Sequence, residues 1–333
     1  MDYEIIDQIG KGSYGVIYKV KIRSQIQVLK EISLKNLSLK QQNEAYREAQ
    51  IMHTLNHPNI VSYYNSQLRK DKLNIFMEYC EDDLHNYIYR NPSPAENQVW
   101  QWTIQLLEGL EYLHSQKIVH RDIKPNNILM KSNILKISDL GESKSLISTQ
   151  QLSTTKVGTP LYLAPELIRN RPYDNKIDIW ALGCVIYFVC QGDPPFGGSN
   201  IISLGYNIVN KSPKPINSKY SRRLQSLIFK LLNKVPEFRP TAAQALQQIR
   251  DDNDMKSRHQ FQKIFSVHSQ QDISRGDDLK EQNKTVQMIQ SRRLERIIQQ
   301  QKDAQLRLCE ADKFSKIILL NRIIKHQSEH YVQ

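Results

Sequence analysis

The stretch "HRDIKPNNILMKSNILKISDLG", residues 120–141, places charged and amide side chains inside an otherwise apolar run. Arg121, Asp122, Lys124, Asn127 and Asp139 alternate there with isoleucine and leucine. Polar groups are costly to bury unless they are paired. Either each of these groups has a structural partner, or together they serve a ligand that needs a base, a cation and two metal ligands.

The composition sets broad limits on the class of protein. The chain has 333 residues, 46 Lys and Arg and 34 Asp and Glu, a formal net charge of +12. The positive charge is spread along the chain, which favours a solvated surface over a binding block. The N-terminus does not resemble a signal peptide, and no apolar run is long enough to span a membrane. The cysteines lack CxxC spacing, so we expect no zinc site, no disulfide framework and a reducing, cytoplasmic compartment.

Hydrophobic periodicity predicts strands early in the chain and helices later. Strands are expected at 3–9, 16–22, 27–32 and 73–79, and helices at 43–55, 98–116 and 178–192. The last helix is apolar nearly all round, so it should be buried and should end at Gly192. This segregation predicts an α+β fold of two packed lobes, a small β-rich N-terminal lobe and a larger α-helical C-terminal lobe.

The composition changes near residue 250. We expect a folded domain at 3–250, a polar linker at 251–283 and a helical tail at 284–333. A heptad counted from Leu294 is interrupted by Gln301, so a coiled coil, docking on the folded domain and partial disorder remain open for the tail. The tail is a candidate for self-association or partner binding. Nucleic-acid binding is not expected, because no aromatic residues interleave with its charges.

"IGKGSYGVIYKV" at 9–20 contains Gly10, Gly12 and Gly15, a GxGxxG pattern. A dinucleotide fold requires a helix directly after the glycines, whereas strand-forming residues follow here. A glycine loop between two strands is typical of a flap whose amides approach phosphates.

Lys30 lies on the strand predicted at 27–32, and Val28 shares its face. Val16 and Val28 are expected to wall an adenine ring, with Lys30 directed at phosphate. The alternative is an edge lysine that reaches water. A buried Lys30 needs a carboxylate, and Glu48 on the helix predicted at 43–55 is the candidate partner.

These motifs, taken together, resemble a eukaryotic protein kinase over about 250 residues. The chain carries the glycine loop, Lys30, Glu48, His120-Arg121-Asp122 with Asn127, Asp139-Leu140-Gly141 and Ala164-Pro165-Glu166 in the family's order. Leu140 replaces the usual Phe and Val28 the usual Ala; neither change removes a catalytic group.

The resemblance implies a function for each group. Catalytic roles fall to Asp122 as proton acceptor, Lys124 at the γ-phosphate, and Lys30 with Glu48. Asn127 and Asp139 would hold Mg²⁺. The ATP-binding set is Ile9, Gly10, Lys11, Gly12, Ser13, Tyr14, Gly15, Val16, Ile17, Val28, Lys30, Met77 as gatekeeper, Glu78 and Cys80 through their backbone, and Leu129. Structural roles are expected for His120, for Asp178 under the catalytic loop, and for Arg239 paired with Glu166.

Lys124 in "HRDIKPNN" and the segment "GTPLYLAPE" resemble the Ser/Thr class of kinases. "HPNIVSYYN", "FMEYCEDDL" and "RPYDNKIDIWALGCVIY" resemble the NIMA-related (Nek) family, although "CEDDL" and "APE" depart from its usual pattern. This implies protein substrates bearing Ser or Thr and a cell-cycle, microtubule or ciliary role. The alternatives are a calcium/calmodulin-type or Aurora-like kinase, a pseudokinase scaffold and, on the glycine loop alone, a nucleotide-binding oxidoreductase.

Residues 142–163 correspond to the activation segment of such a kinase. Hydroxyl side chains recur there at Ser148, Thr149, Ser153, Thr154, Thr155 and Thr159. Thr155 matches the family's usual activating position, and a phosphate on it is expected to pair with Arg121, with Lys144 as a possible second contact. Thr159 is expected to contact Asp122 and Lys124. The alternative is a polar loop rich in Ser and Thr.

Overall fold

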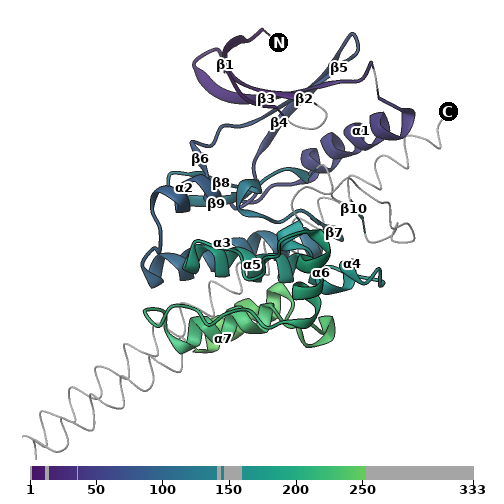
Figure 1. The fold of residues 1–333 in the computed structure, drawn as a ribbon. Coiled ribbons are helices and arrows are strands. Elements are labelled where there is room, and N and C mark those ends of the chain that lie inside the picture. Colours follow the sequence, from purple (N-terminus) through teal and green to yellow (C-terminus); the bar gives the residue numbers. More distant parts are fainter. Residues whose placement is uncertain (1, 12–14, 36, 141–143, 146–159, 253–333) are drawn as a thin grey trace, which may run out of the picture. The chain divides into compact units, whose positions relative to one another are not determined.

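The computed structural model describes residues 2–11, 15–35, 37–140, 144–145 and 160–252, all of which belong to one unit of the chain. A five-stranded antiparallel sheet forms the N-terminal lobe (Figure 1). The strand order is β1-β2-β3-β5-β4. The strands are β1 (Glu4–Lys11), β2 (Gly15–Ile22), β3 (Gln25–Ser33), β4 (Tyr63–Arg69) and β5 (Lys72–Glu78).

One helix, α1 (Leu39–Thr54), packs with this sheet. Its start is fixed by a capping box in which Ser38 and Gln41 exchange side-chain to backbone hydrogen bonds. Its buried face carries Ala45, Glu48 and Met52 at spacings of three and four. Glu48 is therefore placed on the inner face by the same periodicity that buries its apolar neighbours.

The C-terminal lobe is mainly helical (Figure 1). Its helices are α2 (Leu84–Arg90), α3 (Glu96–Ser115), α4 (Pro165–Ile168), α5 (Lys176–Gln191), α6 (Ile201–Asn210) and α7 (Arg222–Leu231), with a further helical stretch at 242–252. Its short strands are β6 (Asp82–Asp83), β7 (Ile118–Val119), β8 (Ile128–Lys131), β9 (Ile134–Ile137) and β10 (Lys144–Ser145), and its 3-10 turns are η1 (Pro125–Asn127), η4 (Pro160–Tyr162) and η5 (Pro236–Phe238).

Helix α5 is the centre of the C-terminal lobe. Residues Ile177–Cys190 are all buried, and the helix ends at Gly192, which adopts a left-handed conformation with φ +80°. Trp180, Cys184 and Cys190 are fully buried, as the apolar pattern predicts. Helices α3 and α7 both contact α5, so the lobe is built around it.

The predicted two-lobed α+β fold is confirmed for the described residues. One boundary is corrected: Asp251 and Asp252, assigned to the linker, continue a helix, and Asp252 pairs with Arg223 at 3.1 Å. The remainder of the predicted linker and the tail at 284–333 lie outside the described residues. None of the helices in the described part is long and apolar enough to cross a membrane.

A buried ion pair joins two distant segments of the C-terminal lobe, as predicted. Arg239 donates from both terminal nitrogens to Glu166, at 2.8 and 3.0 Å. Its remaining donors reach the backbone oxygens of Lys176 and Asn233. Because the guanidinium is satisfied in this way, its burial is tolerated.

We predict that Glu166→Gln lowers the free energy of unfolding by about 3–5 kcal/mol, since it leaves the buried charge of Arg239 without a counter-charge. Urea denaturation of the full chain measures this loss. Arg90→Ala is the matched control, because the Arg90–Asp82 pair is exposed and should contribute less than about 1 kcal/mol. Equal effects of the two substitutions would contradict the structural role of the buried pair.

Candidate active site

The loop at 120–127 is attached to α5 through the carboxylate of Asp178. Asp178 Oδ1 accepts from the Arg121 amide at 2.8 Å, and Oδ2 accepts from the His120 amide at 2.9 Å. His114 Nε2 lies 2.9 Å from the same Oδ2. Burial raises the pKa of Asp178, but the hydrogen bond and charge of His114 and the backbone donors outweigh it and hold the pKa below its ordinary value. The predicted brace under the catalytic loop is therefore present.

His120 serves the same loop and is fully buried. Its Nδ1 accepts from the Asp122 amide at 3.2 Å, and its Nε2 is 2.9 Å from the Ser138 carbonyl oxygen. Because Nδ1 accepts, Nε2 carries the proton and donates it. Both ring nitrogens are thus engaged with backbone, in agreement with a structural role.

Two residues of the site have left-handed backbone conformations, Arg121 at φ +75° and Asp139 at φ +60°. Such conformations cost roughly 1–3 kcal/mol in non-glycine residues and concentrate at functional sites. The Arg121 guanidinium lies 5.1 Å above the ring of Tyr173. The backbone turn at Arg121 precedes Asp122.

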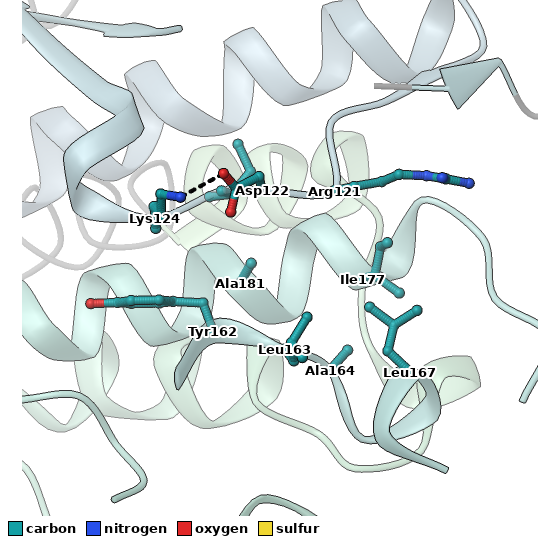
Figure 2. A pocket seen from close by; sticks show the side chains of 10 residues that line it. Arg121, Asp122, Lys124, Tyr162, Leu163, Ala164, Leu167, Ile177 and Ala181 are labelled. Atoms are coloured by element: carbon teal, nitrogen blue, oxygen red, sulfur yellow. Dashed lines mark hydrogen bonds and ion pairs between the residues drawn. The ribbon is translucent and has the colours of Figure 1, made fainter. Parts of the chain in front are cut away.

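Asp122 is oriented by two neighbours. Its Oδ2 accepts from Lys124 Nζ at 2.6 Å, as Figure 2 shows, and from Asn127 Nδ2 at 2.8 Å. Asn127 Nδ2 also donates to the Asp122 carbonyl oxygen at 2.8 Å. With Oδ2 engaged by two donors, Oδ1 is the oxygen suited to accept a proton from a hydroxyl. Asn127 uses its nitrogen in these bonds, so its amide oxygen is the atom that can ligate a metal.

Lys30 links three segments. Its Nζ is 2.7 Å from Glu48 Oε1 and 3.2 Å from Asp139 Oδ1. Burial alone would lower the pKa of Lys30, but the carboxylates of Glu48 and Asp139 outweigh it and raise the pKa above the ordinary lysine value. The lysine is therefore a permanent cation, paired as the sequence predicts with Glu48 and additionally with Asp139.

The strand register defines the wall of the site near Lys30. Val28 pairs with Met77, and Ile17 pairs with Lys30, so these side chains share one face of the sheet. Val16 pairs with Glu31, on the opposite face. The predicted adenine wall of Val16 and Val28 is therefore wrong: Ile17 shares the face of Val28, because β2 begins at Gly15 and alternates from there.

The other predicted ATP-site residues fall on three elements. Ile9, Gly10 and Lys11 end β1, and Leu129 lies on β8. Gly15 is required by the sheet itself, because a Cβ there would collide with the Glu31 carbonyl oxygen of β3. Gly12, Ser13 and Tyr14 lie outside the described residues. So do Gly141 and the hydroxyl residues Ser148, Thr149, Ser153, Thr154, Thr155 and Thr159.

The end of β5 carries a contact that sequence reasoning missed. Glu78 Oε1 is 2.8 Å from Lys131 Nζ, and its Oε2 is 3.0 Å from Lys136 Nζ. Lys136 Nζ also donates to the Pro58 carbonyl oxygen at 2.8 Å. Burial raises the pKa of Glu78, but the two lysines outweigh it and lower the pKa. The side chain of Glu78 thus joins β5 to β8 and β9.

Cys80 follows on the segment after β5. Burial raises the pKa of its thiol to about 12, so the sulfur is protonated at neutral pH. This agrees with the expectation that Cys80 is not a reactive thiol.

The donor set suits a hard divalent cation. Asp139 offers a carboxylate and Asn127 an amide oxygen, the ligand types that Mg²⁺ prefers. Within the described ranges no cluster of three or more acidic, histidine or cysteine side chains is present that could hold a metal by itself. A cation here would therefore depend on further oxygens from a phosphate-bearing ligand and from water.

A pocket opens beside Asp122 (Figure 2). Arg121, Asp122 and Lys124 line one side. The other side is mainly apolar and is formed by Tyr162, Leu163, Ala164, Leu167, Ile177 and Ala181. A pocket with one mainly apolar side, adjoining an oriented carboxylate, is suited to a peptide side chain next to a reacting hydroxyl.

The fold and this constellation define a protein kinase domain: a lysine–glutamate pair under a sheet, an oriented aspartate, and two oxygen ligands from separate loops. The protein kinase domain family matches residues 3–249, and the chain belongs to that family.

Three relatives indicate which class of protein kinase the chain is similar to. The chain is 40% identical over 255 residues to the serine/threonine-protein kinase Nek11 of Mus musculus, covering 74% of this chain and 41% of the relative. It is 38% identical over 246 residues to Nek5 of Homo sapiens, covering 72% and 35%. It is 38% identical over 251 residues to Nek1 of Mus musculus, covering 74% and 21%. The predicted resemblance to Nek Ser/Thr kinases is confirmed, and the chain spans between about one fifth and two fifths of the length of these relatives.

We predict that the stabilisation contributed by Asp178 is lost in acid. The folded-state pKa lies below the ordinary value of 3.8, so the contribution is present above pH 3.8 and disappears as pH falls through the folded-state pKa. The unfolding free energies of wild type and Asp178→Asn should therefore converge below pH 3.8. Denaturant unfolding of both proteins across pH 3–6 measures this, and a constant difference over that range would contradict it.

Proposed function

We propose that this chain transfers the γ-phosphoryl group of ATP to Ser and Thr hydroxyls of proteins. The observation that carries the proposal is the presence of two charge networks, Lys30 with Glu48 and Asp139, and Asp122 with Lys124 and Asn127. Phosphoryl transfer requires positioning and charge neutralisation more than covalent chemistry by the protein. These networks supply both.

Each residue has a defined task in this proposal. Lys30 binds phosphate oxygens and is held in place by Glu48. Asp122 Oδ1 accepts the hydroxyl proton and orients the oxygen in line, while Lys124 lies next to it and contacts the γ-phosphate. Asp139 and the Asn127 oxygen hold Mg²⁺, which when bound neutralises charge on the phosphate oxygens. Ile17, Val28, Met77 and Leu129 enclose the base.

The competing classes are less well supported. A pseudokinase scaffold would tolerate loss of a catalytic group, whereas all six charged or amide groups are present here, bonded within two networks. An oxidoreductase would require a helix after the glycine loop, where β2 begins instead. A calcium/calmodulin-type or Aurora-like kinase is disfavoured by the similarity to Nek kinases.

The similarity to Nek kinases also supports a proposal for the cellular setting. We propose a Nek-like role in the cell cycle or at microtubules or cilia, in the cytoplasm. The tail at 284–333 is proposed to serve self-association or partner binding, which rests on the helix-forming composition of its sequence. For substrates, the Nek resemblance favours an apolar residue a few positions before the phosphorylated Ser or Thr. A flat or strictly basic preference in a peptide-library screen would favour the runner-up kinases.

The direct test compares autophosphorylation of the full chain with that of Asp122→Asn, in ATP and Mg²⁺. The substitution removes the proton acceptor, so turnover should fall by about 10²–10⁴. Nucleotide binding, followed by thermal shift, should be retained because the Lys30 network is intact. Equal activity of the two proteins would refute the enzyme proposal, and wild type that binds ATP without transfer would favour the scaffold.

Activation is proposed to depend on Thr155. A phosphate there adds roughly −1.5 to −2 charge, which can pair with Arg121 directly before the base. Thr155→Ala should lower turnover strongly and leave ATP binding nearly unchanged, while Ser153→Ala and Thr154→Ala should have smaller effects. Full activity of Thr155→Ala, with Thr155 unmodified in active enzyme by mass spectrometry, would remove this mechanism.

A further inference from the structure

Helix α6 presents an apolar face to solvent. Leu204 and Ile208 are buried beneath it, whereas Ile201, Ile202 and Tyr206 are 67%, 81% and 61% exposed. Ile202 and Tyr206 are four residues apart and so stack on one side of the helix, with Ile201 adjacent. An amphipathic helix in a globular protein normally exposes polar side chains on this face.

The helix is firmly held, so its apolar face is not the consequence of loose packing. At its N-terminus, Asn200 and Ser203 form a reciprocal cap. At its C-terminal end, Lys234 Nζ donates to the Ile208 carbonyl oxygen and lies 3.9 Å from the centre of the Phe196 ring. Helix α4 packs beside it, close enough that a Cβ on Gly205 would lie 3.4 Å from Ile168 Cγ2.

The surroundings of this face are positive. Arg169 follows α4 directly, Lys211 follows α6 directly, and both are exposed. Every charged side chain between Asp193 and Glu237 is a lysine or an arginine. Neither Arg169 nor Lys211 forms an ion pair with any residue that the structure describes.

Lys234 is a further cation next to this helix. Burial is the main cause that lowers the pKa of Lys234 to about 8, and the charges of Arg169 and Arg239 act in the same direction. The exposed apolar triad and its two flanking cations, Ile201, Ile202 and Tyr206 with Arg169 and Lys211, are called the α6 surface below.

The chemistry of the α6 surface favours some binding partners over others. The most apolar run of the tail, "FSKIILLNRII" at 314–324, carries lysine and arginine and no carboxylate, so charge opposes its binding here. Nucleic acid would satisfy the cations but would leave the isoleucines uncovered. A ten-residue helix spans about 15 Å, which matches two or three turns of a partner helix and is small for a lipid-anchoring face.

We infer that the α6 surface binds an acidic segment of a partner protein that presents apolar side chains at helical spacing. The apolar side chains of the partner cover Ile201, Ile202 and Tyr206, and its carboxylates pair with Arg169 and Lys211. This surface lies outside the residues assigned to phosphoryl transfer, so the inference does not depend on the proposed kinase activity.

The test uses a fluorescent synthetic peptide of about 14 residues, with leucines at helical spacing and glutamates elsewhere, roughly 21 Å long as a helix. Binding to the full chain is followed by anisotropy. We expect saturable binding that weakens at 1 M salt, where the Debye length is about 3 Å. Two double variants test the surface: one combines Ile202→Ser with Tyr206→Ser, and the other combines Arg169→Glu with Lys211→Glu. Each should weaken peptide binding by about tenfold or more.

Matched controls change equally exposed residues elsewhere. Tyr89→Ser removes an aromatic ring that is 84% exposed on α2, and Lys40→Glu reverses an exposed charge on α1. Both should bind the peptide like wild type. Asp122→Asn should also bind it fully, which separates this inference from the kinase proposal.

Any of three outcomes would overturn the inference. They are that the full chain shows no saturable binding of the peptide at low salt, that both α6 double variants bind the peptide with the wild-type affinity, or that the control variants lose as much peptide affinity as the double variants. Equal affinity for a peptide with alanine in place of leucine would indicate a general polyanion site. Duplex DNA and anionic phospholipid vesicles are also tested as competitors of the peptide. If either displaces the peptide, and does so equally well from the Ile202→Ser, Tyr206→Ser variant, the surface would be assigned to that ligand instead.

Discussion

A single buried carboxylate fixes the loop at 120–127, to which we assign the proposed proton acceptor. Asp178 lies in the first turn of α5, a helix whose remaining inward side chains are apolar, and it is only 1% exposed. Leaving such a charge without partners would be very costly, so the backbone amides of His120 and Arg121 and the ring of His114 must remain in place. The position of Asp122 follows from that requirement, because it is the next residue along the chain.

The rest of the site depends on contacts that cross between the lobes. Lys30 from the sheet reaches Asp139 of the C-terminal lobe while paired with Glu48 of α1. Glu78 at the end of β5 reaches Lys131 and Lys136. Both contacts are charge-assisted, and the Glu78–Lys136 pair is withdrawn from water on both sides. These ionic contacts tie the sheet to the segment that carries Asp139 and to strands β8 and β9.

Much of this organisation could be predicted from the sequence. The features that were predicted wrongly, or not predicted, have physical explanations. Helical and strand periods located α1, α3, α5 and the first three strands, and motif order identified the charged groups of the site. The sheet face predicted for Val16 was wrong because side-chain direction depends on strand register, which the sequence alone leaves undetermined. The role of Glu78 was missed because its partners are more than 50 residues away. The early start of α1 was detectable, since Ser38 and Gln41 have capping-box spacing.

Asp178 is central to the site because its carboxylate positions the loop that carries Asp122, the proposed proton acceptor. The measurement that tests it is the turnover number and the ATP dissociation constant of Asp178→Asn, on protein shown to be folded by circular dichroism. Loss of the anchoring carboxylate should displace the loop, and misplacement by about 1 Å can cost roughly 10²-fold in turnover. We predict a fall of that size with ATP affinity nearly unchanged, because Lys30 and Glu48 are not touched by the substitution. Folded Asp178→Asn with wild-type turnover would contradict the account.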